Sequence, residues 1–125
     1  MSFPNFKNKH SKDSMFSPKE FMDYTKKIGK YPSFKVPKGV IFCYDRDFMK
    51  YLLENHKFTR FDKFFNTYLL NETNNQIAVI GNFGIGAPVV ITILEELIAF
   101  GVKNFISIGT AGSLQKKLKV GDIVI

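Results

Sequence analysis

The chain has 125 residues, of which 45% are apolar, and a formal net charge of +7. This length suits one small domain, and the apolar share is large enough for a hydrophobic core. Cys43 is the only cysteine, which excludes an intrachain disulfide and a cysteine-based zinc site. The 14 Phe residues, in a chain without Trp, are expected mostly in the core.

The basic excess lies in the first half of the chain. Residues 1–60 hold 13 Lys and Arg against 6 Asp and Glu, whereas residues 61–125 hold 5 of each kind. A solvated, lysine-rich surface is the favoured interpretation, and a nucleic-acid surface is a weaker alternative. Arg46 and Arg60 are the only arginines, so no arginine cluster is available for bidentate contacts to phosphates or bases.

The sequence also limits where the protein acts. Its amino terminus lacks the apolar core of a signal peptide, and no apolar run reaches the length of a membrane span. His10 and His56 are far apart, and no metal-ligand spacing connects them to acidic residues. We therefore expect a cytoplasmic protein with no membrane contact and no metal site.

Residues 1–36 are predicted to form a first unit, a basic arm followed by a short helix. Ser17 can cap this helix, Pro18 suits its first position, and Glu20 has the spacing of a capping box. Gly29 ends it. The anchors that we expect for the arm are aromatic: Phe3, Phe6 or Phe16.

Residues 37–125 are predicted to form a second unit, the N-terminal part of an α/β domain. A compact apolar strand is expected at residues 40–44, followed by a helix with apolar residues at helical spacing from Phe48 to His56. Residues 67–70 are a candidate strand, and a polar turn follows it at residues 71–75.

The pattern is clearest from residue 76 onward. It predicts, in order, a strand at 77–80, a glycine turn at 81–86, a helix at 88–100, a strand at 105–108, a second turn at 109–112 and a last strand at 123–125. This order predicts a mainly parallel sheet flanked by helices. Because so few helices could not cover both faces of such a sheet, either other chains complete the fold or the sequence is a truncated or split product, and we favour a truncated α/β fold.

The first glycine turn is a candidate ligand site. Gly81, Gly84 and Gly86 have the spacing G-x-x-G-x-G, which is neither the dinucleotide order G-x-G-x-x-G nor a P-loop. Glycines at the carboxyl end of a parallel strand let backbone N–H groups approach an anion, and a following helix adds partial positive charge. The spacing alone leaves a ligand-binding turn and a purely structural turn equally open.

The second turn, at residues 109–112, also follows a strand, and we expect that strand beside the first. Two neighbouring strand ends with small residues would form a cleft that admits a ligand against the backbone. Thr110 can donate a hydrogen bond to a phosphate or a sugar hydroxyl. The alternative role of Thr110 is to cap the turn.

Four sequence blocks occur together in this part of the chain: Gly-Ile-Gly-Ala-Pro at 84–88, Glu-Glu-Leu at 95–97, Ile-Gly-Thr-Ala-Gly at 108–112 and Gly-Asp-Ile-Val at 121–124. In this order and spacing they resemble the nucleoside phosphorylase family, which includes purine nucleoside and uridine phosphorylases and related nucleosidases. The resemblance covers about residues 76–125. It implies a partial phosphorylase-type α/β fold and cleavage of the N-glycosidic bond of a purine or pyrimidine nucleoside.

The resemblance also implies partners and site residues. Phosphorolytic members use inorganic phosphate as co-substrate and no cofactor, and the family forms trimers or hexamers. By resemblance, Thr110 contacts phosphate and ribose, Ala111 and Gly112 line the base pocket, and Gly84 and Gly86 form the turn at the edge of the substrate site.

Three departures from the family pattern affect the expected chemistry. Ser107 stands where many phosphorolytic members have a phosphate-binding Arg, and Val89 stands where many have Ser. The upstream phosphate loop is not intact, because its register is off by about one residue near Arg46. Arg46 is therefore a candidate phosphate ligand, with an ordinary surface arginine as the alternative. The catalytic acid and the ribose-binding Met-Glu segment come later in family members, so no catalytic residue is assigned.

Three functions remain as alternatives to phosphorolysis. A phosphate-independent nucleoside hydrolase is favoured by Ser107, because a hydroxyl cannot replace a guanidinium group. A non-catalytic module could bind nucleosides or bases in the same small-residue cleft. A nucleic-acid binder would use the lysine-rich first half.

Overall fold

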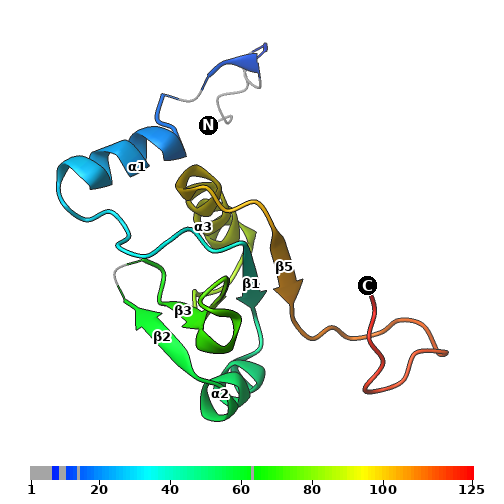
Figure 1. Ribbon diagram of the computed structural model, residues 1–125. Coiled ribbons are helices and arrows are strands. Elements are labelled where there is room, and N and C mark those ends of the chain that lie inside the picture. The colour runs from blue at the N-terminus through cyan, green and yellow to red at the C-terminus, as the bar shows by residue number, and fades with distance from the viewer. Residues whose placement is uncertain (1–6, 9–10, 14, 63) are drawn as a thin grey trace.

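The structure is a computed structural model that describes residues 7–8, 11–13, 15–62 and 64–125. Its elements, in chain order, are α1 (Pro18–Lys27), β1 (Gly39–Cys43), α2 (Arg46–Asn55), β2 (Phe58–Phe61), β3 (Thr67–Leu70), the 3-10 helix η2 (Asn71–Thr73), β4 (Ile77–Gly81), α3 (Ala87–Phe100) and β5 (Phe105–Ile108). The five strands form one sheet in the order β2-β3-β4-β1-β5 (Figure 1). The predicted α/β class is confirmed.

The sheet is mixed, whereas the sequence predicted a mainly parallel one. β1 pairs in parallel with β4 and β5, but β3 pairs antiparallel with both β2 and β4. The connections explain this difference. Only residues 62–66 join β2 to β3, and only residues 71–76 join β3 to β4. Links this short reverse the chain, whereas a parallel pair needs a longer crossover.

Strand β1 lies between β4 and β5, so the prediction that these two strands are neighbours is wrong. The burial of β1 gives the physical reason. Val40 and Phe42 on one face are 1% and 2% exposed, and Cys43 on the other is 1% exposed. A strand that is apolar on both faces is best placed in the centre of a covered sheet.

Two helices cover the two faces of the sheet. Ile93, Leu97 and Phe100 of α3 pack with one face of β1 and β4, in a core that includes Phe42 and Ile80. Met49 of α2 packs on the opposite face, in the smaller cluster that also holds Cys43, Tyr68 and Val79. Of the positions predicted for the apolar face of α2, Leu52 packs against this cluster, whereas Phe48 and Tyr51 are exposed and the buried residue is Met49.

Helix α1 has the predicted capping box. The Ser17 hydroxyl accepts from the Glu20 backbone N–H at 3.2 Å, and the Ser17 backbone N–H donates to the Glu20 carboxylate at 2.8 Å. The donation from the Ser17 backbone N–H, together with one from the Ser17 hydroxyl to the same carboxylate at 2.9 Å, holds the pKa of Glu20 below its usual value. The helix lies against α3 (Figure 1), and its Met22 is buried. Phe16 contacts Phe21, whereas the other expected anchors, Phe3 and Phe6, lie outside the described residues.

Residues 109–125 contain turns but neither helix nor strand, so the predicted strand at 123–125 is wrong. Figure 1 shows this segment extending away from the sheet beyond β5. Ile123, Val124 and Ile125 are 87%, 72% and 118% exposed. An apolar run without a pairing strand has no partners for its backbone hydrogen bonds, and the described residues offer it none.

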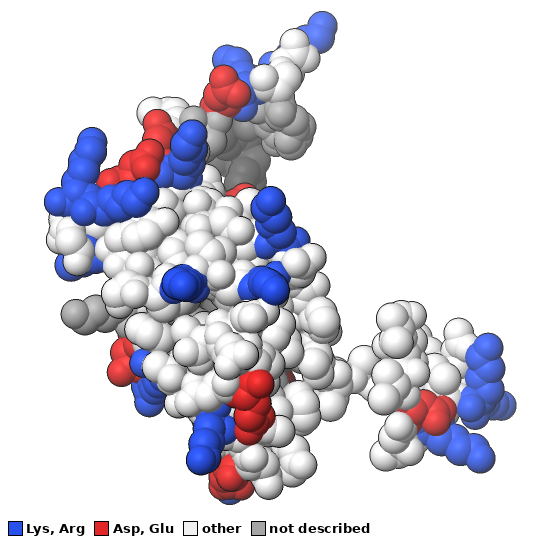
Figure 2. Space-filling view, in the orientation of Figure 1, with Lys and Arg blue, Asp and Glu red and all other residues white. Residues whose placement is uncertain are grey.

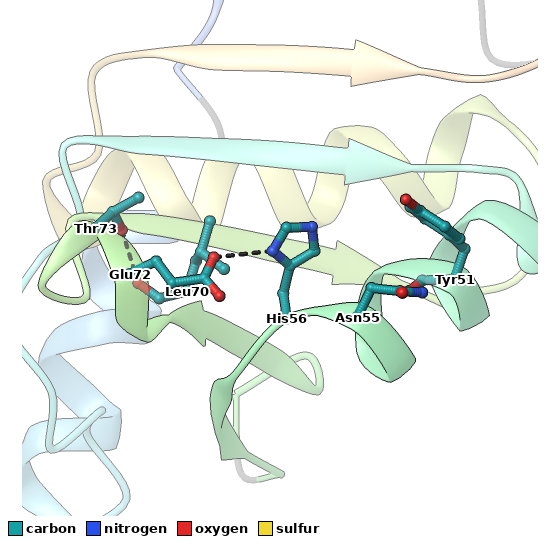
Figure 3. Close-up of polar contacts among 6 residues, drawn as sticks. All are labelled: Tyr51, Asn55, His56, Leu70, Glu72 and Thr73. Carbon is teal, nitrogen blue, oxygen red and sulfur yellow. Dashed lines mark hydrogen bonds and ion pairs between the residues drawn. The ribbon is translucent and has the colours of Figure 1, made fainter.

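A polar contact joins the end of α2 to η2, at the edge of the sheet where the parallel strands begin (Figure 3). His56, the C-cap of α2, lies with Nδ1 2.8 Å from the Glu72 carboxylate, and the Thr73 hydroxyl donates to the Leu70 carbonyl at 2.7 Å. Because η2 precedes the amino end of β4, this contact lies away from the carboxyl ends of the parallel strands. His56 is therefore a structural residue in this fold.

No helix within the described ranges has the length and apolar character needed to cross a bilayer.

Candidate functional site

Three chain segments meet at the carboxyl edge of the parallel strands. Residues 44–46 follow β1, residues 82–87 follow β4, and residues 109–112 follow β5. Because β4, β1 and β5 are parallel neighbours in that order, their carboxyl ends lie at the same edge. This is the edge at which open α/β sheets bind ligands.

The first turn has a backbone that requires glycine at two positions. Gly84 and Gly86 have φ values of 94° and 104°, a region that other residues rarely adopt, and Asn82 has φ 56°. Gly86 is the N-cap of α3 and provides no side-chain cap hydrogen bond. The turn therefore presents bare backbone directly before the amino end of a helix, where partial positive charge favours an anion.

A cleft of about 510 Å³ opens at this turn. Its volume lies within the range of small-molecule sites. Apolar side chains provide its walls, with Tyr44 and Phe83 on the sheet side and Val90 and Ile91 on α3. The backbone of residues 84–87 completes the lining. We call this space the apolar arm of the cleft.

A second space of about 490 Å³ adjoins the first, and both are lined by Tyr44, Phe83, Gly84 and Ile85. Its remaining lining is polar and comes from the start of α2 and the end of β4: Cys43, Asp45, Arg46 and Asn82. We call this space the polar arm. The two arms are thus adjoining pockets, one mainly apolar and one with charged side chains, and we refer to the pair as the cleft.

Arg46, a predicted phosphate ligand, lines the polar arm. It is the first residue of α2 and is exposed. The neighbouring Asp45 carboxylate accepts the Phe48 backbone N–H at 2.7 Å and so caps the helix. Within the described ranges Arg46 makes no ion pair, so its guanidinium group is available to an anion in the cleft.

Tyr44 lies between the two glycine turns and separates them. Its backbone N–H donates to the Ile108 carbonyl at 2.9 Å, which extends the pairing of β1 with β5. Its hydroxyl lies 3.4 Å from the Ser107 hydroxyl, and its ring centroid lies 5.3 Å from that of Phe83. A Cβ at Gly109 would lie 3.4 Å from the Tyr44 Cβ. The ring therefore occupies the space predicted between the two turns.

The second turn does not share the cleft of the first. Thr110, Ala111 and Gly112 are exposed and line neither arm. A side chain at Gly112 would meet nothing within 4 Å. Thr110 and Gly84 lie at the same edge of the sheet but on opposite sides of Tyr44. The structure thus brings Arg46, Gly84 and Gly86 together and leaves the other three predicted residues apart from them.

Burial raises the pKa of two groups, Cys43 in the lining of the polar arm and Glu96 further along α3. Cys43 is 1% exposed, its thiol donates to the Asp45 carbonyl at 3.3 Å, and burial raises the pKa of this thiol. It therefore stays protonated and is a poor nucleophile at neutral pH. On α3, Glu96 is half-buried, and desolvation raises the pKa of its carboxyl group, whereas Glu95 is exposed.

Lysines lie mostly away from the cleft. Figure 2 shows blue side chains at the α1 end of the molecule and on the segment after β5, with fewer on the body between them and, beside red ones, near α2; none of the described lysines lines either arm. Among the described residues, no group of three His, Cys, Asp or Glu side chains could hold a metal ion. The charged group that the structure places at the cleft is thus Arg46, with Asp45 beside it.

Sequence reasoning missed Tyr44 and Phe83. Each follows a buried strand within two residues, which was visible in the sequence. Tyr44 was not recognised as a site residue because β1 had not been assigned its central place in the sheet. Once β1 lies between β4 and β5, the residue that directly follows it must face both turns.

Comparisons with known proteins agree with the predicted resemblance. A family model described as the phosphorylase superfamily matches residues 38–125. Uridine phosphorylase of Haemophilus influenzae is 37% identical over 73 residues, covering 58% of this chain and 29% of that protein. A DeoD-type purine nucleoside phosphorylase of Caldanaerobacter subterraneus subsp. tengcongensis is 54% identical over 43 residues, covering 34% of this chain and 18% of that protein.

The Escherichia coli uridine phosphorylase is 33% identical over 54 residues, covering 43% of this chain and 21% of that protein. The chain thus spans less than a third of the length of the curated relatives it matches. No solved structure gives a significant match. The family match confirms the resemblance drawn from the four sequence blocks.

Proposed function

Because this chain belongs to the phosphorylase superfamily, we propose that it provides the nucleoside- and phosphate-binding edge of a protein that cleaves the N-glycosidic bond of a nucleoside. One observation carries the proposal. The glycine turn before α3 and Arg46 line two adjoining pockets at the carboxyl edge of the sheet, and Gly84 lines both. A nucleoside and an anion can therefore be held side by side there.

The proposed chemistry follows from the charges that such a reaction develops. Breaking the bond between sugar and base leaves positive charge on the sugar ring and electron density on the base. An anion held against the ring stabilises the sugar, and positioning of the two reactants supplies much of the remaining rate. Arg46 would hold this anion through charge-assisted hydrogen bonds, together with backbone N–H groups of the turn at Gly84 and Gly86.

The predicted roles of Thr110, Ala111 and Gly112 remain part of the proposal. These residues lie at the same edge of the sheet, on the β5 side of Tyr44. They would contact ribose and base only if the ligand extends past Tyr44 toward β5. Assembly as a trimer or hexamer and a cytoplasmic location are likewise proposed, from the family resemblance and the composition.

Phosphate-independent hydrolysis is a second candidate, and Ser107 favours it. By the family resemblance, its neutral hydroxyl stands where a guanidinium group would bind phosphate, and it lies 3.4 Å from the hydroxyl of Tyr44. Neutral hydroxyl groups attract phosphate less strongly than an arginine does. Water could then be the acceptor of the sugar.

A panel of purine and pyrimidine nucleosides, assayed with and without inorganic phosphate, tests the proposal. Base release that requires phosphate supports phosphorolysis, and release without phosphate supports hydrolysis. Calorimetric binding without release would support a non-catalytic module. If the protein neither binds nucleosides nor releases a base from them, the proposal is contradicted.

Substitutions of the two arginines test whether Arg46 binds the phosphate anion. Arg46→Gln should weaken phosphate binding about tenfold or more, because the charge-assisted hydrogen bonds to the anion are lost. Arg60→Gln is the matched control, since Arg60 is on β2, pairs with Asp62 and packs over the Tyr68 ring. Equal effects of the two substitutions would show that Arg46 acts only through overall charge.

A further inference from the structure

We propose that a pocket at the amino ends of the parallel strands binds a nucleoside monophosphate, with the phosphate held by Lys35 and Lys38. We call this space, of about 460 Å³, the amino-edge pocket. Residues 33–36 and 38, which precede β1, line one side of it, and residues 74–76, which precede β4, line another (Figure 1). The pocket thus lies at the edge of the sheet opposite the cleft and shares no lining residue with it. The inference goes beyond the proposed function and does not depend on it.

The charges that line the amino-edge pocket are all positive. Lys35 and Lys38 line it, and no carboxylate does. Both lysines are exposed, and neither makes an ion pair within the part of the chain that the structure describes. A neighbouring hollow gives the contrast, because there Arg60 and Asp62 line the same wall and pair with each other. The chain balances the charge of Arg60 itself, whereas the two lysines remain available to an anion.

The floor of the amino-edge pocket is apolar and partly open. Phe34, Phe61 and Leu69 line it, and all three belong to the main core cluster or pack against it. Leu69 is buried, but Phe34 and Phe61 are only half-buried. Their ring centroids lie 4.5 Å apart, and the rings are tilted by 42°. Two adjacent rings with exposed surface give a flat heteroaromatic ring a place to stack.

The wall before β4 adds side-chain amides to the pocket. The backbone N–H groups of Asn74, Asn75 and Gln76 are used within the turn, where they donate to carbonyl groups of residues 70–73 at 2.9, 3.2 and 3.1 Å. Their side-chain amides make no hydrogen bond among the described residues. An amide has both a donor and an acceptor, and so has the edge of a nucleobase. These three side chains can therefore recognise the edge of a base.

The loop that carries the two lysines is fixed by its neighbours. The Phe34 ring meets Phe100 of α3 edge to face, with 5.4 Å between the centroids. The Lys38 backbone N–H donates to the Gln76 carbonyl at 2.7 Å, and the Lys38 carbonyl accepts from the Asn104 side-chain amide at 2.7 Å. The two lining segments are therefore joined directly. A pocket whose walls are already in place costs less ordering when a ligand binds.

These features together match one class of ligand. The unpaired ammonium groups favour a phosphate, the open rings favour a flat ring, and the amides favour donor and acceptor atoms at the edge of that ring. A nucleoside monophosphate has all three, and the volume of the pocket lies within the range of small-molecule sites. A nucleoside lacks the charge and inorganic phosphate lacks the ring, so each should bind there about tenfold or more weakly than the monophosphate.

Calorimetric titration of the 125-residue chain with adenosine monophosphate tests the inference. Lys35→Gln and Lys38→Gln should each weaken binding about tenfold, because each variant loses a charge-assisted hydrogen bond to the phosphate. Lys116→Gln is the matched control, since Lys116 is exposed beyond β5 and does not line the pocket. It removes the same charge and should leave the affinity within about twofold of the wild type, because salt screens distant charges. An equal loss in all three variants would overturn the inference.

Phenyl phosphate tests whether the pocket recognises a nucleotide or any aromatic phosphate. It has the phosphate and a flat ring but no donor or acceptor at the ring edge, so it should bind about fivefold or more weakly than adenosine monophosphate. Gln76→Ala should weaken adenosine monophosphate about threefold and leave phenyl phosphate unchanged. Equal affinity of the wild type for the two ligands would overturn the assignment to a nucleotide.

Arg46→Gln separates the amino-edge pocket from the cleft. Arg46 lines the polar arm, so its loss should leave the affinity for adenosine monophosphate within about twofold. If the wild type does not bind this ligand, or binding depends on Arg46 and not on the two lysines, the inference is overturned and the proposed function is unaffected. If binding depends on Lys35 and Lys38 but no nucleoside is bound or cleaved, the inference stands and the proposed function fails.

Discussion

The two glycine turns at the carboxyl edge of the sheet have similar composition but different surroundings. The turn after β4 leads directly into α3, and aromatic and aliphatic side chains wall the cleft beside it. The turn after β5 is followed by residues with no helix or strand, and its Thr110, Ala111 and Gly112 are exposed. Both turns follow strands of the same sheet, so the strand alone does not explain the difference.

Small residues create a site only when neighbouring elements enclose them. Glycine lets a ligand approach the backbone, but the walls come from the helix and from residues such as Tyr44 and Phe83. The first turn has both contributions. The second has the small residues, with Tyr44 packed against Gly109 on one side only.

The largest effect on the free energy of unfolding is expected from removing a buried side chain of the helix that follows the first turn, compared with an exposed side chain that follows the second. Leu97 of α3 is 1% exposed and Leu114, beyond β5, is 103% exposed. Leu97→Ala should lower the free energy of unfolding by about 2–5 kcal/mol, because it leaves a cavity in the core. Leu114→Ala should change it by less than about 0.5 kcal/mol. Urea unfolding of both variants is the measurement. Equal losses of free energy of unfolding would mean that the segment after β5 is packed as well as α3.

The next largest effect on stability is expected from adding a side chain at a glycine in each of the two turns. A Cβ at Gly81 would lie 2.9 Å from the Met49 sulfur and 3.4 Å from the Cys43 carbonyl, whereas Gly112 has nothing within 4 Å. Gly81→Val should therefore lower the free energy of unfolding by about 1–3 kcal/mol through overpacking. Gly112→Val should cost less than about 0.5 kcal/mol. Thermal unfolding compares the pair, and a cost at Gly112 as large as at Gly81 would mean that the second turn is enclosed.

The start of α2, which lies between the two turns, gives a smaller effect. Asp45 caps this helix through its hydrogen bond to the Phe48 backbone N–H. Asp45→Ala should lower the free energy of unfolding by about 1 kcal/mol, and Asp45→Asn should recover most of the loss because asparagine is also a good cap. Failure of Asn to recover stability, measured by urea unfolding, would show that Asp45 acts through its charge instead.

The smallest effect is expected for the pH dependence of stability that arises from Glu96 on α3. Burial raises the pKa of Glu96 above its usual 4.5, so the folded state binds this proton more readily than the unfolded state. The resulting stability is present below pH 4.5 and is lost as pH rises through the folded-state pKa. Glu96→Gln should therefore raise the melting temperature slightly at pH 7 relative to the wild type.

That gain should be smaller at pH 4, where the wild-type carboxyl group is largely protonated. Glu95→Gln on the exposed side of the same helix is the matched control and should show no such difference between the two pH values. A gain of the same size at both pH values for Glu96→Gln would point to a cause other than protonation.

Local patterns predicted most of the elements. The capping box at Ser17, the apolar strand at residues 77–80 and the helix that ends at Gly101 are each specified by a few neighbouring residues, and all three are confirmed. The sequence could not give the order of the strands. Which strand lies beside β4 depends on contacts between residues far apart in the chain, and β1 takes that place through its two buried faces.

The site was predicted in part for the same reason. The glycine spacing located the turn at Gly84 and Gly86, because glycine is required locally by the backbone. Arg46 is a candidate phosphate ligand from the sequence, and it lines the polar arm together with Gly84. The position of Tyr44 between the turns depends on the central place of β1, so no local pattern could assign it. The roles of these residues in binding stay predictions.

The most direct test of the account is to map ligand contacts on the backbone by NMR. Amide resonances of the ¹⁵N-labelled 125-residue chain would be followed while inosine and inorganic phosphate are added. The account predicts saturable shifts at residues 44–46 and 83–87, with little change in the η2 region on the opposite edge. Binding without shifts at those residues, or shifts confined to the lysine-rich α1, would contradict it.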